Sequence, residues 1–540
     1  MAGGFLVLPG EVSKDCNHSQ LNKPLSEKLK VCMTKINGYV FYALAFVVLA
    51  ANSSVAFARS ENQWQPDQRV PGYLDDTFTP YLVADRNRTV HAFASQRVNN
   101  EVFDRAIFYR QWSLAGGWTI PVDILFLPQG DTQIQGAFLD KTGMMHIIFW
   151  GGSPRDAHIY YSTAPVVDVG RSSAWSTPII IGEKAGGTSS AYLAGDERGN
   201  LVVAYSGLRD GNGVYATHSK DDGKTWTKPQ PVFLTYDSNL VPFSLRLFLG
   251  KSNQIRAAWN VVTSRGTDIS LHFANFDLNK SEWSEPITLN TRVEKLDNFG
   301  PSFPSMVDNG EEVIIMYNNG NPFTGRPVGP GRPVQMVSVS DDGGSTWNVP
   351  VVPFFRHVGR SGEHTLALDS NNVTHALFVQ RIEETVNNEY RAISGVYHSA
   401  YKDGLWSDPD RFITTYAPHD VRAVVSQGNV LLVVWRQDPG AEKVHGVWYS
   451  YAILDTPELS VLPIPMQSST PDISITSSVD PSLVSETPSE APNVDLSNRS
   501  FGLAGNPAGS LLVAVLIVIL LLASVIVIYS LNRNRENNQP

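Results

Sequence analysis

The sequence predicts an all-β protein, specifically a seven-bladed β-propeller, and three observations lead to that prediction. A tryptophan followed three residues later by proline recurs at intervals of roughly 50 to 65 residues, a spacing typical of blade-sized repeats. Short apolar runs separated by polar turns fill the intervals. A shortened copy, Trp64-Gln-Pro66, precedes the first full one. The full copies begin at Trp118, Trp175, Trp226, Trp283, Trp347 and Trp406.

Each repeat is expected to form one four-stranded blade. Two apolar or alternating runs joined by a polar turn, as in residues 79–96, 135–152 and 190–207, predict the first two strands. The Trp-x-x-Pro segment supplies the fourth strand, where proline is tolerated because an outer edge strand need not donate every hydrogen bond. The third strands are expected at residues 106–112, 158–164, 213–219, 269–275, 334–340, 395–401 and 445–451.

The count of strands predicts how the ring closes. The last repeat ends near Leu454 without a Trp-x-x-Pro segment, whereas the segment at Trp64 has no preceding repeat. Pairing the two completes a seventh blade, so the N-terminal strand closes the last blade. The propeller domain is expected to span residues 59–454. A six-bladed ring decorated by one hairpin is the alternative.

The residues before the repeats have the features of a leader and signal peptide, expected to span 1–58. Three lysines precede the apolar run 38–51, and Ala56-Phe57-Ala58 fits the small-x-small pattern of a signal-peptidase site. The only cysteines, Cys16 and Cys32, lie in this segment. The mature chain would therefore contain no disulfide and must be stabilised by packing.

The residues after the repeats predict a membrane anchor. Residues 455–507 are acidic and rich in serine, threonine and proline, a composition typical of an extended stalk. Residues 508–531 carry no charge and are long enough to span a bilayer as a helix. Arg533 and Arg535 follow, which predicts a cytoplasmic tail at 532–540 and an ectodomain outside. We therefore expect a single-pass membrane protein at the cell surface.

The composition also excludes some classes of function. The net charge of −10 argues against a nucleic-acid partner, which requires a basic surface to neutralise phosphates. No motif indicates a metal or an organic cofactor. The stretch SKDDGK has some likeness to a calcium loop, but the spacing and the closing glutamate of an EF-hand are missing.

Two stretches, SKDDGKTW at 219–226 and SDDGGSTW at 340–347, share the pattern Ser-x-Asp-x-Gly-x-Thr-Trp. Both fall between a third and a fourth strand, where glycine supplies backbone angles closed to other residues. The aspartate can accept hydrogen bonds from turn amides, and the tryptophan can pack between sheets. We expect a structural staple formed by Ser219, Asp221, Gly223, Thr225 and Trp226, and again by Ser340, Asp342, Gly344, Thr346 and Trp347.

These residues resemble the Asp-box, or bacterial neuraminidase repeat, of the sialidase-like superfamily of β-propellers. Degenerate versions at 402–406 and 114–118 extend the resemblance over most of the ectodomain in architecture, although the strict motif covers two blades. The resemblance implies that the boxes lie on the face away from the active site. The sequence departs from the family at residues 77–80, where a first strand that usually opens with an arginine reads Thr-Phe-Thr-Pro.

The opposite face would be built from the loops before the first strands and between the second and third strands. Its arginines would suit an acidic sugar, because guanidinium groups bind carboxylates through paired hydrogen bonds. We assign substrate binding to Arg155, Arg209, Arg265, Arg360, Arg381, Arg436 and Tyr236. Acid or base catalysis is assigned to Asp76, Glu363, His364 and His419. For each arginine taken alone, a local ion pair with a neighbouring aspartate is the simpler interpretation.

These features together predict a membrane-anchored, sialidase-like propeller that recognises a glycan or glycoconjugate, with acidic sugars favoured. The residues leave open whether it also cleaves the glycan, as a glycoside hydrolase or a polysaccharide lyase. The alternative is a non-catalytic adhesion or receptor module that binds a protein partner through the same loops.

Overall fold

The computed structural model describes residues 64–463 except 99–103, 128–130, 154–155, 187–190, 251–252, 293–299, 320–333, 355–356, 358–360, 387–388, 415–417 and 438–445; for 361–363 and 381–394 it describes the backbone only. The chain divides into two compact units, 1–468 and 469–540, and the first contains all of these residues. The predicted leader, membrane helix and cytoplasmic tail, and residues 464–507 of the stalk, lie outside the described part. Within that part, no helix is both long and apolar enough to cross a membrane.

The described chain is almost entirely β-structure, with two short 3-10 helices, η1 (Val166–Asp168) and η2 (Ser172–Ala174). The first strands of successive units are β2 (Tyr81–Ala84), β7 (Asp131–Leu139), β11 (Ala191–Gly195), β15 (Leu240–Gly250), β20 (Pro301–Asp308), β23 (Ser361–Leu368) and β28 (Pro418–Ser426). The second strands are β3 (Val90–Arg97), β8 (Met144–Ser153), β12 (Leu201–Gly207), β16 (Gln254–Thr263), β21 (Val313–Asn319), β24 (Thr374–Val386) and β29 (Val430–Gln437).

The third strands coincide with the seven runs expected from the sequence. They are β4 (Arg105–Ser113), β9 (Asp156–Pro165), β13 (Gly213–Ser219), β17 (Asp268–Asp277), β22 (Gln335–Ser340), β25 (Glu389–Lys402) and β30 (Gly446–Ile453). Within each unit the first strand pairs with the second and the second with the third, always antiparallel.

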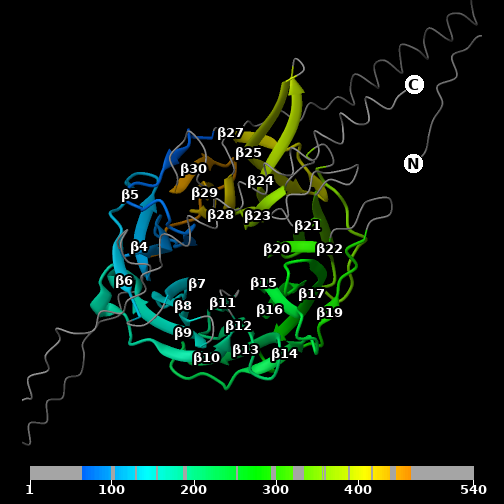
Figure 1. Ribbon diagram of the computed structural model, residues 1–540. Coiled ribbons are helices and arrows are strands. Elements are labelled where there is room, and N and C mark those ends of the chain that lie inside the picture. The colour runs from blue at the N-terminus through cyan, green and yellow to red at the C-terminus, as the bar shows by residue number, and fades with distance from the viewer. Residues whose placement is uncertain are drawn as a thin grey trace, which may run out of the picture. The chain divides into compact units, whose positions relative to one another are not determined.

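The units follow one another in a propeller-like arrangement (Figure 1). Their first strands contact one another in the order β2, β7, β11, β15, β20, β23, β28 and back to β2, which makes a closed circuit. Two of the units, β7–β10 and β11–β14, are joined into one eight-stranded sheet through a single residue pair, Ala185 of β10 and Gly207 of β12.

The N-terminal strand pairs with the C-terminal unit, as the sequence predicts. In β1 (Gln68–Arg69), Gln68 lies opposite Tyr449 and Arg69 opposite Trp448 of β30. The amide of Val70 donates to the carbonyl oxygen of Val447 at 2.8 Å and extends this pairing. Main-chain hydrogen bonds therefore join residues about 380 positions apart, and β1 covers the outer edge of β30.

The outer strands differ from the simple expectation that each Trp-x-x-Pro segment forms one strand. In three units a two-residue strand at the tryptophan, β5 (Gly117–Trp118), β18 (Glu282–Trp283) or β26 (Leu405–Trp406), is followed after the proline by β6 (Val122–Leu125), β19 (Ile287–Thr288) or β27 (Asp410–Thr414). In two others only the part after the proline pairs, as β10 (Ile179–Ala185) and β14 (Gln230–Leu234). Proline has no amide hydrogen, so the ladder breaks there.

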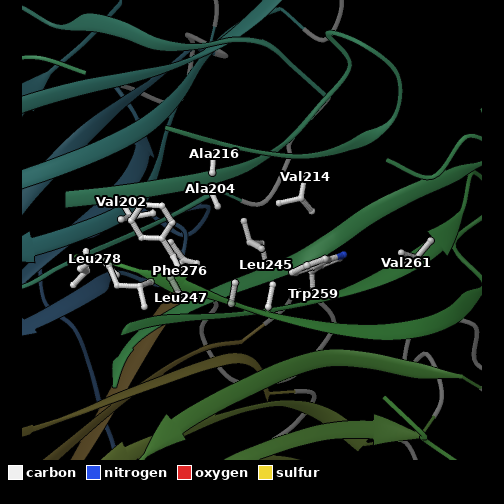
Figure 2. Packing of buried hydrophobic residues seen from close by; sticks show 14 residues of the cluster. Val202, Ala204, Val214, Ala216, Leu245, Leu247, Trp259, Val261, Phe276 and Leu278 are labelled. Atoms are coloured by element: carbon white, nitrogen blue, oxygen red, sulfur yellow. The ribbon is translucent and has the colours of Figure 1, made fainter. Parts of the chain in front are cut away.

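The hydrophobic core lies between neighbouring sheets. Figure 2 shows one such cluster, where Val202 and Ala204 of β12 and Val214 of β13 face side chains of the next unit, including Leu245 and Trp259. Trp259 is completely buried. Each aliphatic or aromatic side chain removed from water in this way contributes about 1.5–3 kcal/mol, so the interfaces between sheets supply the stability that disulfides do not.

Candidate functional site

A bulge recurs near the start of four consecutive first strands. In β15, Phe243 lies opposite Asn260 of β16 and Arg246 lies opposite Ala258. Three residue steps on β15 therefore match two on its partner, so β15 carries one extra residue. The first bulge residue, Ser244, has a φ of 49°, the left-handed conformation expected at this position. Equivalent shifts occur in β20, β23 and β28.

The bulges put corresponding side chains on one level of the four strands. The residues that follow them are Arg246 in β15, Ser305 in β20, His364 in β23 and Arg422 in β28. We call these four residues the post-bulge tier. Because first strands contact one another around the ring, residues from different units converge here. One direct link joins the Ser305 hydroxyl to the carbonyl oxygen of His364 at 2.8 Å.

Arg246 is a half-buried cation whose described contacts are a main-chain oxygen and an aromatic ring. Its Nη1 donates to the carbonyl oxygen of Leu245 at 2.9 Å, and its guanidinium carbon lies 5.9 Å from the ring centroid of Tyr192 in β11. Among the described residues no ion pair involves Arg246. A guanidinium has five N–H donors, so most of its hydrogen-bonding capacity is not used by a carboxylate of the protein.

Arg422 is balanced by an acid and an aromatic ring. Its Nε lies 3.5 Å from Oδ1 of Asp420, and its guanidinium carbon lies 3.8 Å from the ring centroid of Tyr81. Burial alone would raise the pKa of Asp420, but the charge of Arg422, helped by Arg246, holds that pKa below its ordinary value. Burial raises the pKa of Tyr81 despite both arginines. At neutral pH Asp420 is therefore ionised and Tyr81 is neutral.

His364 is buried and uncharged at neutral pH. Burial lowers the pKa of its imidazole to about 4, and the charge of Arg246 acts in the same direction. A ring nitrogen, Nε2, lies 2.8 Å from the carbonyl oxygen of Met316 and therefore donates to it. The other nitrogen, Nδ1, is then a hydrogen-bond acceptor, and it is buried with no partner. The imidazole can accept a hydrogen bond but has no proton to give from Nδ1.

A second group with a shifted pKa lies in β17, the third strand of the unit that contains Arg246. Burial raises the pKa of Asp268 in β17 to about 7. Its Oδ1 accepts a hydrogen bond from Nδ2 of Asn260 at 2.8 Å, whereas its Oδ2 is buried without a partner. Asn260 is completely buried. This carboxyl group therefore holds a proton up to near-neutral pH.

The predicted catalytic residues are distributed over different environments. His364 belongs to the tier, and His419 lies at the start of the β28 bulge opposite Arg436. Asp76 forms an ion pair with Arg97, with 2.8 Å between Oδ2 and Nε. Glu363 lies in β23, and its side chain is outside the described part.

The predicted substrate-binding residues whose side chains the structure describes lie in different surroundings. Nη1 of Arg209 donates to the carbonyl oxygen of Pro229 at 3.2 Å, and Arg265 is an exposed turn residue. Tyr236 is 94% exposed. The guanidinium of Arg436 lies 5.5 Å from the ring centroid of Phe78. Arg155, Arg360 and the side chain of Arg381 lie outside the described residues.

The residues of the two Ser-x-Asp-x-Gly-x-Thr-Trp stretches form two closed corners at the other end of the sheets. Oδ1 of Asp221 accepts from the amide of Thr225 at 2.9 Å and Oδ2 from its hydroxyl at 2.6 Å. The amide of Gly223 donates to Ser219 Oγ at 2.9 Å. Trp226 packs edge-to-face against Tyr161 of the preceding unit, with 5.0 Å between ring centroids.

The second corner repeats this geometry. The two oxygens of Asp342 accept from the amide and the hydroxyl of Thr346 at 2.8 and 2.7 Å, and the amide of Gly344 donates to Ser340 Oγ at 2.7 Å. Trp347 packs against Phe273 with 5.1 Å between ring centroids. Both corners follow third strands. In an antiparallel sheet, that end is opposite to the one where the first strands begin and the bulges lie.

Reasoning from the sequence missed Arg246, Arg422, Tyr81 and Tyr192. All four lie within first strands, whereas the sequence analysis assigned the site to loops. A signal was present, because an arginine interrupts otherwise apolar runs at LRLFL and VRAVV. A charge in an inner strand is costly unless it is paired or serves a ligand.

Comparison with known proteins gives structural neighbours at low similarity. No family model and no curated protein sequence matches the chain. A protein of unknown function from Dyadobacter fermentans DSM 18053 has 14% identity and a TM-score of 0.43, covering 73% of this chain and 99% of that one. An ulvan lyase has 12% identity and a TM-score of 0.47, covering 72% and 96%. The NanB sialidase of Streptococcus pneumoniae has 10% identity and a TM-score of 0.38, covering 72% and 71%. The neighbours of this propeller-like chain thus include glycan-acting enzymes.

Proposed function

We propose that the protein is a sialidase-like propeller that binds an acidic glycan through the post-bulge tier. The observation that carries the proposal is the half-buried guanidinium of Arg246, which forms no ion pair with a described carboxylate, although its charge lowers the pKa of Asp420. A carboxylate of a sugar acid fits this group, because two parallel N–H donors match two carboxylate oxygens. Tyr192 lies in β11, next to β15, and Tyr81 lies in β2, next to β28; their hydroxyl groups supply neutral polar contacts.

The balance of charge in the tier also supports an anionic ligand. The charges of Arg246 and Arg422 outnumber that of Asp420, while His364 is neutral at physiological pH. Arg422 is already paired with Asp420. Among the described side chains of the tier and Asp420, one positive charge remains for a ligand, which suits a single carboxylate better than a neutral sugar. In a half-buried setting such a pair is screened less by solvent than at the surface.

The proposal includes a ring of seven blades. The eight-stranded sheet counts as two blades, since only the pair Ala185 and Gly207 joins its halves. The closed circuit of seven first strands and the pairing of β1 with β30 support the same count. We further propose, from the Ser-x-Asp-x-Gly-x-Thr-Trp pattern, that the two corners are Asp-boxes of the sialidase-like superfamily with a structural role.

The proposed function is binding of a glycan, and its cleavage is secondary. Asp420 is ionised and His364 is neutral at physiological pH, so neither is prepared to protonate a leaving group. His364 Nδ1 and the Asp420 carboxylate could accept a proton instead, which is the requirement of elimination rather than of hydrolysis. The apolar segment 508–531 and the signal-like segment 1–58 support a proposed location at the cell surface, with the propeller outside.

A glycan-array screen of the full-length chain tests this function, with mass spectrometry of every bound glycan. Binding of sialylated or uronate-containing glycans at unchanged mass would support a lectin-like module. A glycan that gains the mass of water on cleavage would indicate a hydrolase, and an unsaturated product would indicate a lyase. Binding confined to neutral glycans would contradict the proposal. Absence of glycan binding would reject it in favour of the receptor module that binds a protein partner.

A further inference from the structure

An aromatic residue lies beside Arg246 on the same strand. Phe243 is 38% exposed, although the residues on both sides of it, Pro242 and Ser244, are buried. An exposed phenylalanine costs free energy unless something covers it. It is not a disordered tip, because it pairs in register with Asn260 inside the β15–β16 ladder.

The β15 bulge brings Phe243 and Arg246 onto the same face of the sheet. In a regular strand, residues three positions apart point to opposite faces. Their partners Asn260 and Ala258, however, are two positions apart on β16, and residues two apart share a face. The extra residue in β15 therefore starts both side chains on the same side of the strand, with their backbone positions about 7 Å apart. From there the ring contacts Phe303 of β20, and the guanidinium lies near Tyr192 of β11.

Phe303 of the next unit fixes the position of this ring. The ring centroids of Phe243 and Phe303 are 6.1 Å apart with an interplanar angle of 72°, an edge-to-face contact. Such a contact uses at most one face of the Phe243 ring, and 38% of the side chain remains exposed to a ligand. Phe303 is itself the first bulge residue of β20, with a φ of 51°. Two bulges in adjacent units thus hold the aromatic pair.

We propose that Phe243 is the platform of a second sugar subsite, which binds the sugar unit attached to the acidic one held by Arg246. The C–H groups on one face of a pyranose ring would pack against the open face of the aromatic ring, whose π-electrons carry partial negative charge. The inference rests on the proposed function and narrows it. The ligand is an acidic sugar within an oligosaccharide, and a free monosaccharide acid fills only half of the site.

Calorimetric titration of the full-length chain tests the subsite with two pairs of probes. One pair is N-acetylneuraminic acid and sialyllactose; the other is glucuronic acid and a hyaluronan tetrasaccharide. The wild-type chain should bind the larger member of at least one pair more tightly than its monosaccharide. Phe243→Ala should weaken binding of that oligosaccharide about tenfold, with monosaccharide affinity unchanged. Phe243→Tyr, which keeps an aromatic face, should restore the affinity.

The matched control is Leu405→Ala, which removes a 71% exposed apolar side chain on a hairpin between third and fourth strands. It should leave both affinities unchanged, and the melting temperature of every variant is measured to detect loss of packing against Phe303. If Phe243→Ala binds the oligosaccharide as the wild type does, or loses both probes equally, the platform is wrong and the role of Arg246 stands. If the wild type binds no acidic probe, the proposed function fails and the subsite with it.

Discussion

The two Ser-x-Asp-x-Gly-x-Thr-Trp corners and the post-bulge tier are both made of polar side chains, but they use their hydrogen bonds differently. In the first corner the hydroxyl and amide of Thr225 satisfy both oxygens of Asp221 and hold the pKa of that carboxyl at about 2. In the tier, Arg246 forms no ion pair and His364 Nδ1 no hydrogen bond with any residue that the structure describes. Polar groups whose hydrogen bonds are all made within the protein stabilise a turn. Buried polar groups without a partner lower stability, and a ligand that bonds to them can offset this loss.

The largest expected effect is a loss of stability when the first corner is changed at Gly223. Gly223 has a φ of 80°, and a Cβ there would lie 1.9 Å from the hydroxyl oxygen of Tyr161. Gly223→Ala should lower the free energy of unfolding by about 4 kcal/mol, because steric overlap adds to backbone strain. Urea denaturation measures the loss. Glycan affinity, measured where the variant is still folded, should not change.

Gly404 provides the matched control for this substitution. It has a φ of 79° in the degenerate box, yet no atom lies within 4 Å of the position of its Cβ. Gly404→Ala should therefore cost only the strain of the left-handed conformation, about 1 kcal/mol. Equal losses at the two glycines would show that the corner does not depend on close packing against the preceding unit.

The next effect concerns the pH dependence of stability that the buried carboxyl group of Asp268 causes. Burial raises its pKa to about 7, so the folded protein holds a proton that the unfolded chain has released. Stability from this group is present below about pH 4 and is lost as the pH rises through about 7. Asp268→Asn should be more stable than the wild type at about pH 8, by about 3 kcal/mol, and equal to it near pH 4.

Denaturation curves across this pH range measure the difference. Asp210→Asn, at an exposed aspartate in a loop between second and third strands, is the control. It should leave the dependence of stability on pH unchanged. A wild-type stability that does not fall between about pH 5 and 8 relative to Asp268→Asn would mean that the buried carboxyl is ionised and has a partner.

A smaller effect of opposite sign comes from His364. Its pKa is about 4 in the folded protein and higher when unfolded, so the unfolded chain binds the proton first as the pH falls. Stability therefore decreases from about pH 6.5 down to about 4. His364→Gln, whose amide can still donate to Met316, should remove about 2 kcal/mol of that decrease at about pH 5.

Thermal melts of wild type and His364→Gln at about pH 5 and 7 measure this change. His218→Gln, on β13 and away from the tier, is the comparison variant; burial lowers the pKa of His218 as well, but this residue is less buried, so the variant should remove a smaller part of the decrease. Identical pH dependence in wild type and His364→Gln would show that the imidazole takes up its proton in the folded state without cost.

More of the fold than of the candidate site could be predicted from the sequence. Regular Trp-x-x-Pro spacing predicts the repeat, and the orphan segment at Trp64 predicts the pairing of β1 with β30. These signals are local and periodic, so a single chain reveals them. The prolines also explain why the outer strands are interrupted, a detail that the spacing alone did not predict.

The tier could not be predicted because it depends on bulges and on convergence of distant strands. Nothing in the local sequence FSLRLF indicates an extra residue opposite Trp259, yet that residue places Arg246 on the face of Phe243. Arg246 and Arg422 are about 175 positions apart in the chain and act on the same Asp420 carboxyl. Such convergence follows from closure of the ring and not from any motif.

The measurement that tests the central claim most directly is a calorimetric titration of wild type, Arg246→Met and Arg246→Lys with the acidic glycan that the array identifies. The account predicts that Arg246→Met loses at least about 100-fold in affinity at unchanged melting temperature, and that Arg246→Lys, which keeps the charge but not the fork, recovers only part of it. Wild-type affinity in Arg246→Met would contradict the account, because the unpaired guanidinium would then not be where the acid binds.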